Sequence, residues 1–220
     1  MFELWKEDQS RVRLDENSQV SSFLGSYWVD RTNWTAIDTP PYSASYAKLN
    51  VHNDTIFVMM GTTDGQIVAV ENISQGNGVK VLNLVATARA GMWFYCFGAR
   101  NVTTSNCGMQ FLDVNQNVTF DSQAKWLRFA GVERNPVYNQ DYAWPSGVPT
   151  VAVGMAQRGT WLQPNQVGQY RSFMIMTYGL RISTGLAAYR VIPRQGPLGN
   201  AATSPQPPPG ALLYADVTRY

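Results

Sequence analysis

The sequence predicts an all-β protein built as two β-sandwich-like lobes that arose by tandem duplication. Short apolar runs rich in β-branched and aromatic residues recur along the 220 residues, separated by Gly, Asn and Asp. This spacing is typical of sandwiches and barrels. A strand–turn–strand motif near the start also recurs near the middle, which places the lobes at residues 1–106 and 107–220.

The clearest strand signals lie between residues 47 and 97. Asn53-Asp54, Asp64-Gly65 and Asn77-Gly78 separate successive apolar runs there, and such pairs favour tight turns between antiparallel strands. No segment keeps a 3.6-residue apolar period over three turns, so no long helix is expected. A short helix or a strand fits residues 122–130 equally well. Further strands are expected at 92–97, 151–155, 171–178 and 187–192.

Residues 193–210 differ from the rest because proline and glycine dominate them. Proline lacks a backbone donor and is poorly tolerated inside a sheet. The sequence therefore predicts an extended arm or loop here, ordered only by contact with another subunit. Residues 211–220 are expected to form a last strand, either in their own lobe or added to a neighbouring subunit.

The internal repeat relates residues 2–25 to residues 109–131. Each copy alternates apolar residues on both sides of a polar turn, which predicts a β-hairpin, although hairpins can also share this pattern by chance. A looser match between Gly91–Tyr95 and Gly185–Tyr189 would extend the duplication. The matched positions are Phe2 and Leu4 with Met109 and Phe111, Val12-Arg13-Leu14-Asp15 with Val118-Thr119-Phe120-Asp121, and Phe23 and Gly25 with Phe129 and Gly131.

Charge and hydropathy argue against nucleic-acid binding and membrane insertion. The net charge is +2, and no run of Lys or Arg is present to neutralise phosphates. No stretch approaches 18 apolar residues. The start is acidic and polar by Lys6, unlike a secretory signal, so synthesis and folding in a host cytoplasm are expected. Cys96 and Cys107 are too few for a disulfide framework, and reduced thiols are expected, although a hairpin could join them.

No constellation of residues indicates catalysis. His52 is the only histidine, which disfavours a His-rich metal site and most histidine relays. Asp15 and Asp121 occupy equivalent repeat positions, so we expect them to lie apart and to accept hydrogen bonds in turns. No serine elbow or phosphate-binding loop occurs. The sequence thus predicts a non-enzyme with no metal site and no cofactor.

Aromatic residues in loops are the remaining candidates for binding. Aromatics bury a large area at low entropic cost, and so serve subunit interfaces and sugar stacking; they also cap the protein's own core. Only 15% of residues are charged, which suits subunits packed together but is also usual for strands. The candidate interface or ligand contacts are Trp34, Tyr42, Tyr46, Tyr142 and Trp144.

The second repeat copy carries a family resemblance. It reads Gly108-Met109-Gln110-Phe111-Leu112-Asp113, then Val118-Thr119-Phe120-Asp121-Ser122 and Trp126-Leu127-Arg128-Phe129. This resembles the opening of small structural proteins associated with the tail tip and tail fibres of long-tailed bacteriophages, which have Tyr-Gly-Leu-x-Val followed by Phe-Asp-Ser. The first copy departs from that pattern, with Leu14-Asp15-Glu16.

The resemblance implies a virion structural protein of a bacteriophage tail tip or baseplate, present in multiple copies. Its partners would be other tail-tip or baseplate proteins, and its location the virion tail. Two alternatives remain open from the sequence. One is a receptor-recognition module that attaches to a host-surface glycan or protein, and the other is a capsid decoration protein.

Overall fold

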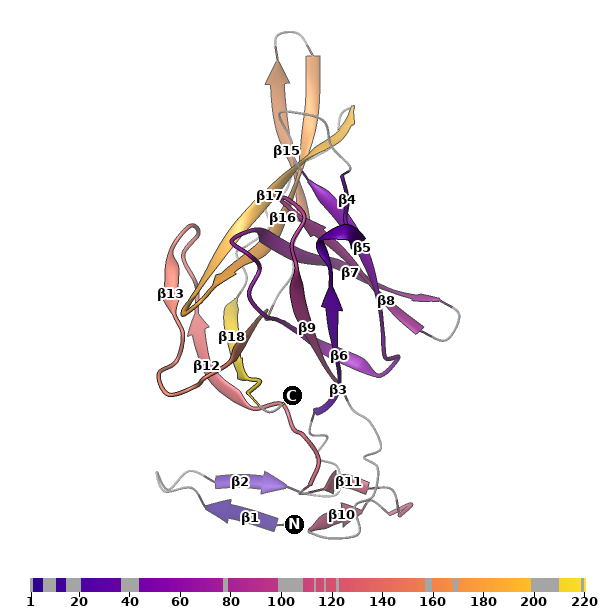
Figure 1. Ribbon diagram of the computed structural model, residues 1–220, viewed down its shortest axis with the longest axis vertical. Helices are drawn as coiled ribbons and strands as arrows, with labels where there is room; N and C mark the ends of the chain where they lie inside the picture. Colours follow the sequence, from indigo (N-terminus) through magenta and orange to yellow (C-terminus); the bar gives the residue numbers. More distant parts are fainter. Residues whose placement is uncertain are drawn as a thin grey trace.

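A computed structural model confirms the all-β, sandwich-like prediction (Figure 1). Apart from one 3-10 turn, Arg31–Asn33, every regular element that it describes is a strand. Among the described residues there is no helix of the length and hydropathy needed to cross a bilayer. The structure describes residues 2–5, 11–14, 21–36, 44–76, 79–98, 109–112, 114–116, 118–121, 123–156, 160–167, 170–198, 210–218 and 220.

Two large antiparallel sheets form the sandwich. The six-stranded sheet has the order β12-β18-β14-β6-β9-β3. The facing sheet has the order β13-β17-β16-β7-β8-β5-β4, with β15 paired to β16 off this path. The first sheet consists of β3 (Ser22–Val29), β6 (Thr55–Met60), β9 (Met92–Gly98), β12 (Phe129–Arg134), β14 (Val151–Met155) and β18 (Ala211–Asp216). The second consists of β4 (Thr35–Ala36), β5 (Ser45–Val51), β7 (Ile67–Gly76), β8 (Val79–Ala86), β13 (Asp141–Ala143), β15 (Thr160–Val167), β16 (Tyr170–Ser183) and β17 (Leu186–Leu198).

The strand order supports the predicted duplication. The first half supplies β3-β9-β6 to one sheet, and the second half supplies β12-β18-β14 in the mirrored order. In the other sheet β5-β8-β7 corresponds to β13-β17-β16 in the same way. The halves therefore have the same six-strand topology, and they meet edge to edge where β6 pairs with β14 and β7 pairs with β16.

A shared irregularity strengthens this correspondence. The register of β3 against β9 shifts between Phe23 and Gly25. The register of β12 against β18 shifts between Phe129 and Gly131, the residues matched to them in the repeat. A bulge at the same place in both halves is a feature that related strands retain. The repeat thus continues from the hairpins into both edge strands of the six-stranded sheet.

Both repeat copies begin with a two-stranded antiparallel hairpin, as predicted. In the first copy β1 (Phe2–Trp5) pairs with β2 (Arg11–Leu14), and in the second β10 (Gln110–Leu112) pairs with β11 (Val118–Asp121). The two hairpins lie at the same end of the molecule, below the sandwich in Figure 1. Each is followed in sequence by one edge strand of the six-stranded sheet.

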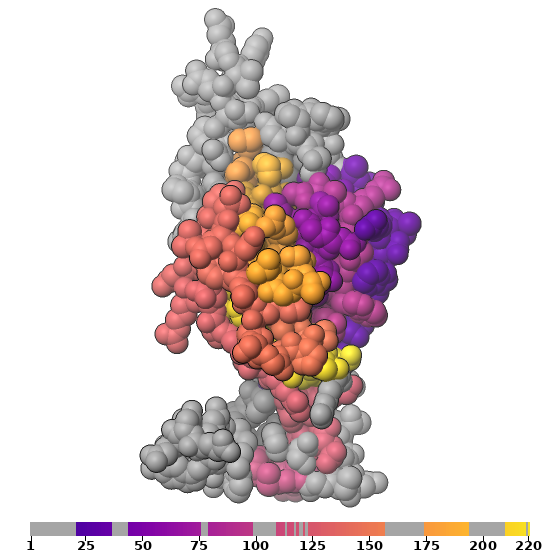
Figure 2. Space-filling view, turned by 60° about the vertical axis from the view of Figure 1, so that its left-hand side comes forward, coloured from indigo at the N-terminus to yellow at the C-terminus, as the bar shows by residue number. Residues whose placement is uncertain are grey.

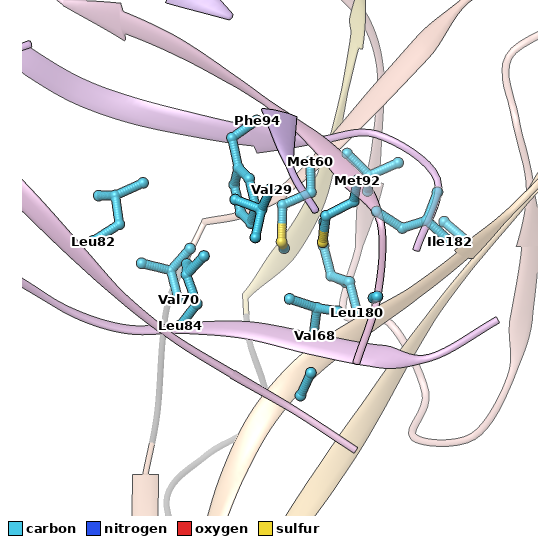
Figure 3. Packing of buried hydrophobic residues seen from close by; sticks show 14 of the residues in the cluster. Val29, Met60, Val68, Val70, Leu82, Leu84, Met92, Phe94, Leu180 and Ile182 are labelled. Carbon is cyan, nitrogen blue, oxygen red and sulfur yellow. The ribbon is translucent and has the colours of Figure 1, made fainter. Parts of the chain in front are cut away.

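The halves are not separate domains, although each supplies three corresponding strands to each of the two sheets. One core cluster takes Phe94 and Val70 from the first half and Leu180 and Ile182 from the second (Figure 3). In the space-filling view the indigo-to-magenta and red-to-yellow surfaces adjoin along the body of the molecule (Figure 2). Residue 106 therefore divides the chain between the repeats but not the sheets or the core.

Two sequence interpretations need correction. The match of Gly91–Tyr95 with Gly185–Tyr189 is wrong, because β9 corresponds to β18, whereas the second segment enters β17 of the other sheet. The prolines at 193 and 197 do not end the sheet, since β17 continues through both to Leu198.

The proline-containing part of β17 is tolerated because one edge is open. Strand β13 pairs only with Leu186–Ala188. Among the described residues, the later part of β17 therefore pairs with β16 alone. A proline can occupy such an edge position without removing a ladder bond. Residues 199–209, the rest of the predicted arm, lie outside the described residues. The last strand, β18, joins the chain's own sheet between β12 and β14.

Candidate functional site

The predicted contact aromatics that the structure describes do not form one surface. Trp34 is 2% exposed and its Nε1 donates to the Ala90 carbonyl over 2.7 Å, so it belongs to the core. Tyr42 lies outside the described residues. Tyr46 is half-buried, and its hydroxyl bonds to Asn83 Oδ1.

The two predicted aromatics of the second half lie at the margin of the core. Tyr142 and Trp144 are half-buried and pack against the main cluster. The Tyr142 hydroxyl accepts a hydrogen bond from the Val137 N–H at 2.6 Å. Both rings thus cover the main core from its margin, in the second half of the chain.

Two tryptophans that the sequence reasoning did not select are the exposed pair. Trp28 on β3 is 48% exposed and Trp93 on β9 is 44% exposed. They are cross-strand partners, with ring centroids 5.4 Å apart and planes inclined by 56°. Their neighbours Val29 and Phe94 enter the core, so alternation places both indoles on the outer face of the six-stranded sheet. That alternation was the available sequence signal.

Each of the two tryptophans has a glycine close beside it, and at Trp28 the glycine lies against the ring itself. A Cβ atom at Gly91 would lie 2.9 Å from Cζ2 of Trp28, closer than a methyl group can approach. A Cβ at Gly61 would lie 3.4 Å from the Cβ of Trp93, and the Gly61 N–H donates to the Trp93 carbonyl over 2.9 Å. The Trp28 ring and the Cβ of Trp93 therefore each adjoin a glycine, where a larger residue would have to displace them.

An ion pair borders the tryptophans. Arg31 donates to Asp64 Oδ2 through Nη2 at 2.8 Å and Nε at 3.3 Å. The side-chain hydrogen bond from Arg31 is the main cause that lowers the pKa of Asp64, and the Gly91 N–H contributes. Because Gly91 also contacts Trp28, the ion pair and this ring adjoin the same residue.

The 3-10 turn fixes a second carboxylate beside the pair. Asp30 accepts hydrogen bonds from the Thr32 N–H and hydroxyl, both at 2.9 Å. The bond from the Thr32 backbone is the main cause that lowers the pKa of Asp30, and a hydrogen bond from the Trp28 side chain also lowers it. Asn33 completes the capping box by accepting from the Asp30 N–H at 2.8 Å. This turn therefore fixes the backbone that carries Arg31.

A second surface feature is an open apolar pocket of about 350 Å³. It lies where β6 and β14 join the two halves. In the described part of these strands, Val153 and Met60 are the residues that pair. Phe57 and Ile56 at its rim are 39% and 52% exposed. Its lining comes from both sheets, because Ile73 of β7 joins Ile56, Phe57, Met59, Gly154, Met155 and Leu213 of the six-stranded sheet.

The outer face of the six-stranded sheet is apolar well beyond the pocket. Met59, Tyr95 and Phe97 form a second buried cluster on this face, while alternate residues of β9 enter the main core. Phe129 and Val132 on β12 are 53% and 52% exposed. They pair with Ala215 and Leu213, which belong to or pack against the outer cluster, and so lie on the same face.

Polar groups singled out in the sequence take structural positions. Asp121 is fully buried; its carboxylate accepts from the Gln123 N–H at 2.7 Å and from Gln110 Nε2 at 2.8 Å. His52 lies in the turn between β5 and β6, where its Nδ1 accepts from the Asp54 N–H at 3.2 Å. Asp15 lies outside the described residues.

Two further titratable groups, Cys96 and Asp141, also take structural positions. Burial raises the pKa of the free Cys96 thiol to about 12, while Cys107 lies outside the described residues. Asp141 accepts from Arg181 at 2.8 Å and from the nearly buried Arg190 at 2.9 Å. Within the described part of the chain, no three His, Cys, Asp or Glu side chains come together as metal ligands would.

Comparison with known proteins gives no match to a family model, a curated protein or a solved structure.

Proposed function

We propose that this chain is a structural subunit of a bacteriophage tail tip or baseplate, and that the outer face of its six-stranded sheet packs against other tail proteins. The proposal combines the sequence resemblance of the second hairpin with one observation on the surface. That observation is the apolar outer face, with Phe57, Phe129 and Val132 exposed beside an open pocket.

Along a strand, residues that face the core alternate with residues that face outward. An outer face that contacts only water is normally polar. In β9 the outward-facing residues are also apolar. Phe94 and Cys96 enter the main core, while Tyr95 and Phe97, which alternate with them, belong to the cluster on the outer face. Part of this face is covered by the chain itself, since Tyr220 packs on Phe23 and Phe97 with centroids 4.8 and 5.5 Å away. The part around Phe57 and Val132 remains accessible, and large exposed apolar patches mark interaction sites.

The resemblance also agrees with a structural role for the motif residues. Asp121, which matches the family's Phe-Asp-Ser, is buried and bonded to its own hairpin and turn. A buried, hydrogen-bonded carboxylate stabilises the local fold, as expected for a motif with a structural role.

Immunogold labelling of purified particles tests the proposed location. Antibody raised against the purified chain is expected to label the tail end of particles produced by cells carrying its gene. Label over the head would favour a capsid decoration protein, and unlabelled particles would overturn the proposal.

A matched pair of variants tests the proposed surface. Phe57→Asp should reduce incorporation into particles at least severalfold, because the charge would have to be desolvated at the interface. Val137→Asp is the control, since Val137 is 58% exposed in the loop after β12. Equal incorporation of both variants would show that the outer face is not the interface.

A further inference from the structure

We propose that Trp28 and Trp93, with Arg31 and Asp64 at their edge, form a binding site for an uncharged pyranose sugar. This site goes beyond the structural role proposed above and does not depend on it. It lies at the β3 edge of the six-stranded sheet, whereas the apolar pocket lies at the β6–β14 junction.

The ring arrangement suits the apolar face of a sugar. Each indole is nearly half exposed, and the two centroids are 5.4 Å apart, close to the width of one pyranose ring. Because the planes are inclined by 56°, the pair forms an angled surface rather than a flat stack. The axial C–H groups of a pyranose carry partial positive charge and are attracted to the negative face of an aromatic ring.

The polar groups suit the hydroxyls of the same sugar. Arg31 has donors beyond the two used for Asp64, and a carboxylate oxygen accepts more than one hydrogen bond. Donors and acceptors side by side can bind adjacent hydroxyls, which both donate and accept. A purely hydrophobic partner would leave this exposed ion pair unmatched.

The site is organised in advance of binding. The Trp28 ring packs close to the Gly91 backbone, and the capping box fixes the turn that carries Arg31. From the core side Trp34 donates to the Ala90 carbonyl, which holds the chain next to Gly91. A site that is already ordered loses little conformational entropy on binding.

The local charge selects against acidic sugars. The pKa values of Asp30 and Asp64 are both lowered, so both carboxylates are ionised at neutral pH. Arg31 is the single cation bonded within this group. Two carboxylates against one guanidinium would repel a sialic acid or uronic acid, and so the occupant is an uncharged hexopyranose or N-acetylhexosamine unit.

A binding experiment on the full chain tests the site. The probes are neutral tetrasaccharides of glucose, of mannose and of N-acetylglucosamine, with sialyllactose as the charged comparison. Saturation-transfer NMR reports contact with the protein, and titration of tryptophan fluorescence gives the affinity. We expect saturable binding of at least one neutral probe, and weaker binding of sialyllactose.

Variants then locate the binding. Trp93→Ala should weaken it by about tenfold or more, and Arg31→Gln by severalfold, without a change in the thermal midpoint beyond that of the control. The control is Tyr138→Ala, because Tyr138 is 57% exposed and lies in the loop before β13. It should bind like the unchanged chain.

Several results would overturn the proposal. These are no saturable binding of any neutral probe, binding that Trp28→Ala and Trp93→Ala leave unchanged, or tighter binding of the sialylated probe. Self-association that Trp93→Ala abolishes, in the absence of sugar binding, would assign the pair to a contact between copies instead. Particle labelling is measured separately, so the sugar site and the structural role can fail independently.

Discussion

At the scale of single residues, Asp121 shows how one side chain connects a hairpin to the chain that follows. Its carboxylate bonds to Gln110 on the opposite strand and to the Gln123 N–H in the next turn. Its carbonyl also accepts from the Trp126 indole at 2.9 Å. The second hairpin and the turn after it therefore share one buried acceptor.

Asp121→Ala should lower the free energy of unfolding by about 1 to 2 kcal/mol, because the partly buried Gln110 and Gln123 donors lose their acceptor. Urea unfolding followed by tryptophan fluorescence measures the change. Asp121→Asn is the control; it keeps one oxygen for the Gln123 N–H and should cost less. An alanine variant as stable as the unchanged chain would show that the carboxylate does not support the fold.

At the same scale, burial separates tryptophans that look alike in sequence. Trp28 and Trp34 lie six positions apart in one aromatic-rich segment. Strand alternation on β3 turns Trp28 outward, whereas Trp34 follows the 3-10 turn and enters the core. The sequence predicted Trp34 as a contact residue because it was taken for a loop aromatic, and that signal does not report burial.

At the scale of elements, the end of β9 is fixed by close packing against a turn. Gly98 pairs with Ser22 of β3 and with Thr55 of β6. A Cβ at this position would lie 1.8 Å from the Asp54 carbonyl oxygen. The β5–β6 turn can therefore approach β9 only because residue 98 has no side chain.

Gly98→Ala should destabilise the protein by about 3 kcal/mol, since the turn backbone must move away from β9 to admit the methyl group. Gly210→Ala is the matched control, because no atom lies within 4 Å of the Cβ it would add. Thermal unfolding of both variants measures the difference. Similar midpoints would contradict the close contact at Gly98.

Strand signals in the sequence predicted where strands occur better than where each strand ends. The turns at Asn53-Asp54 and Asp64-Gly65 occur between β5, β6 and β7 as predicted, with Asp64 at φ +52° and Gly65 at φ +75°. The continuation of β17 through Pro193 was not predictable from propensity. It depends on which edge lacks a partner, and that is decided by the short length of β13.

At the scale of the whole molecule, the duplication forms one continuous structure. The halves share both sheets and the main core. Met59 lies over Gly154 at the β6–β14 junction. A Cβ atom added at Gly154 would be 2.6 Å from the Met59 sulfur. The junction therefore joins a bulky residue of one half to a glycine of the other.

Fragments 1–106 and 107–220 should not fold separately, because each leaves two strand edges unpaired and the shared core open to water. Thermal melts followed by circular dichroism are expected to show a cooperative transition only after the fragments are mixed. The control is the full chain cut after folding at a protease site placed between Asn106 and Cys107, which should remain associated. A cooperative transition in either fragment alone would show independent lobes.

The local features of this protein can be predicted from its amino-acid sequence. Apolar alternation and turn pairs specify strands and hairpins, since they act between residues close in the chain. The repeat likewise indicated two related halves, and both copies form hairpins.

How those strands combine depends on contacts between distant parts of the chain. Pairing of β6 with β14 and of β7 with β16 brings together residues far apart in sequence, and no local pattern encodes such a choice. The same pairing fixes which apolar side chains are covered and which remain outside. Exposure of Trp28, Trp93 and Phe57 therefore follows from the assembled sheets, because burial depends on neighbours supplied by the whole fold rather than on residue type.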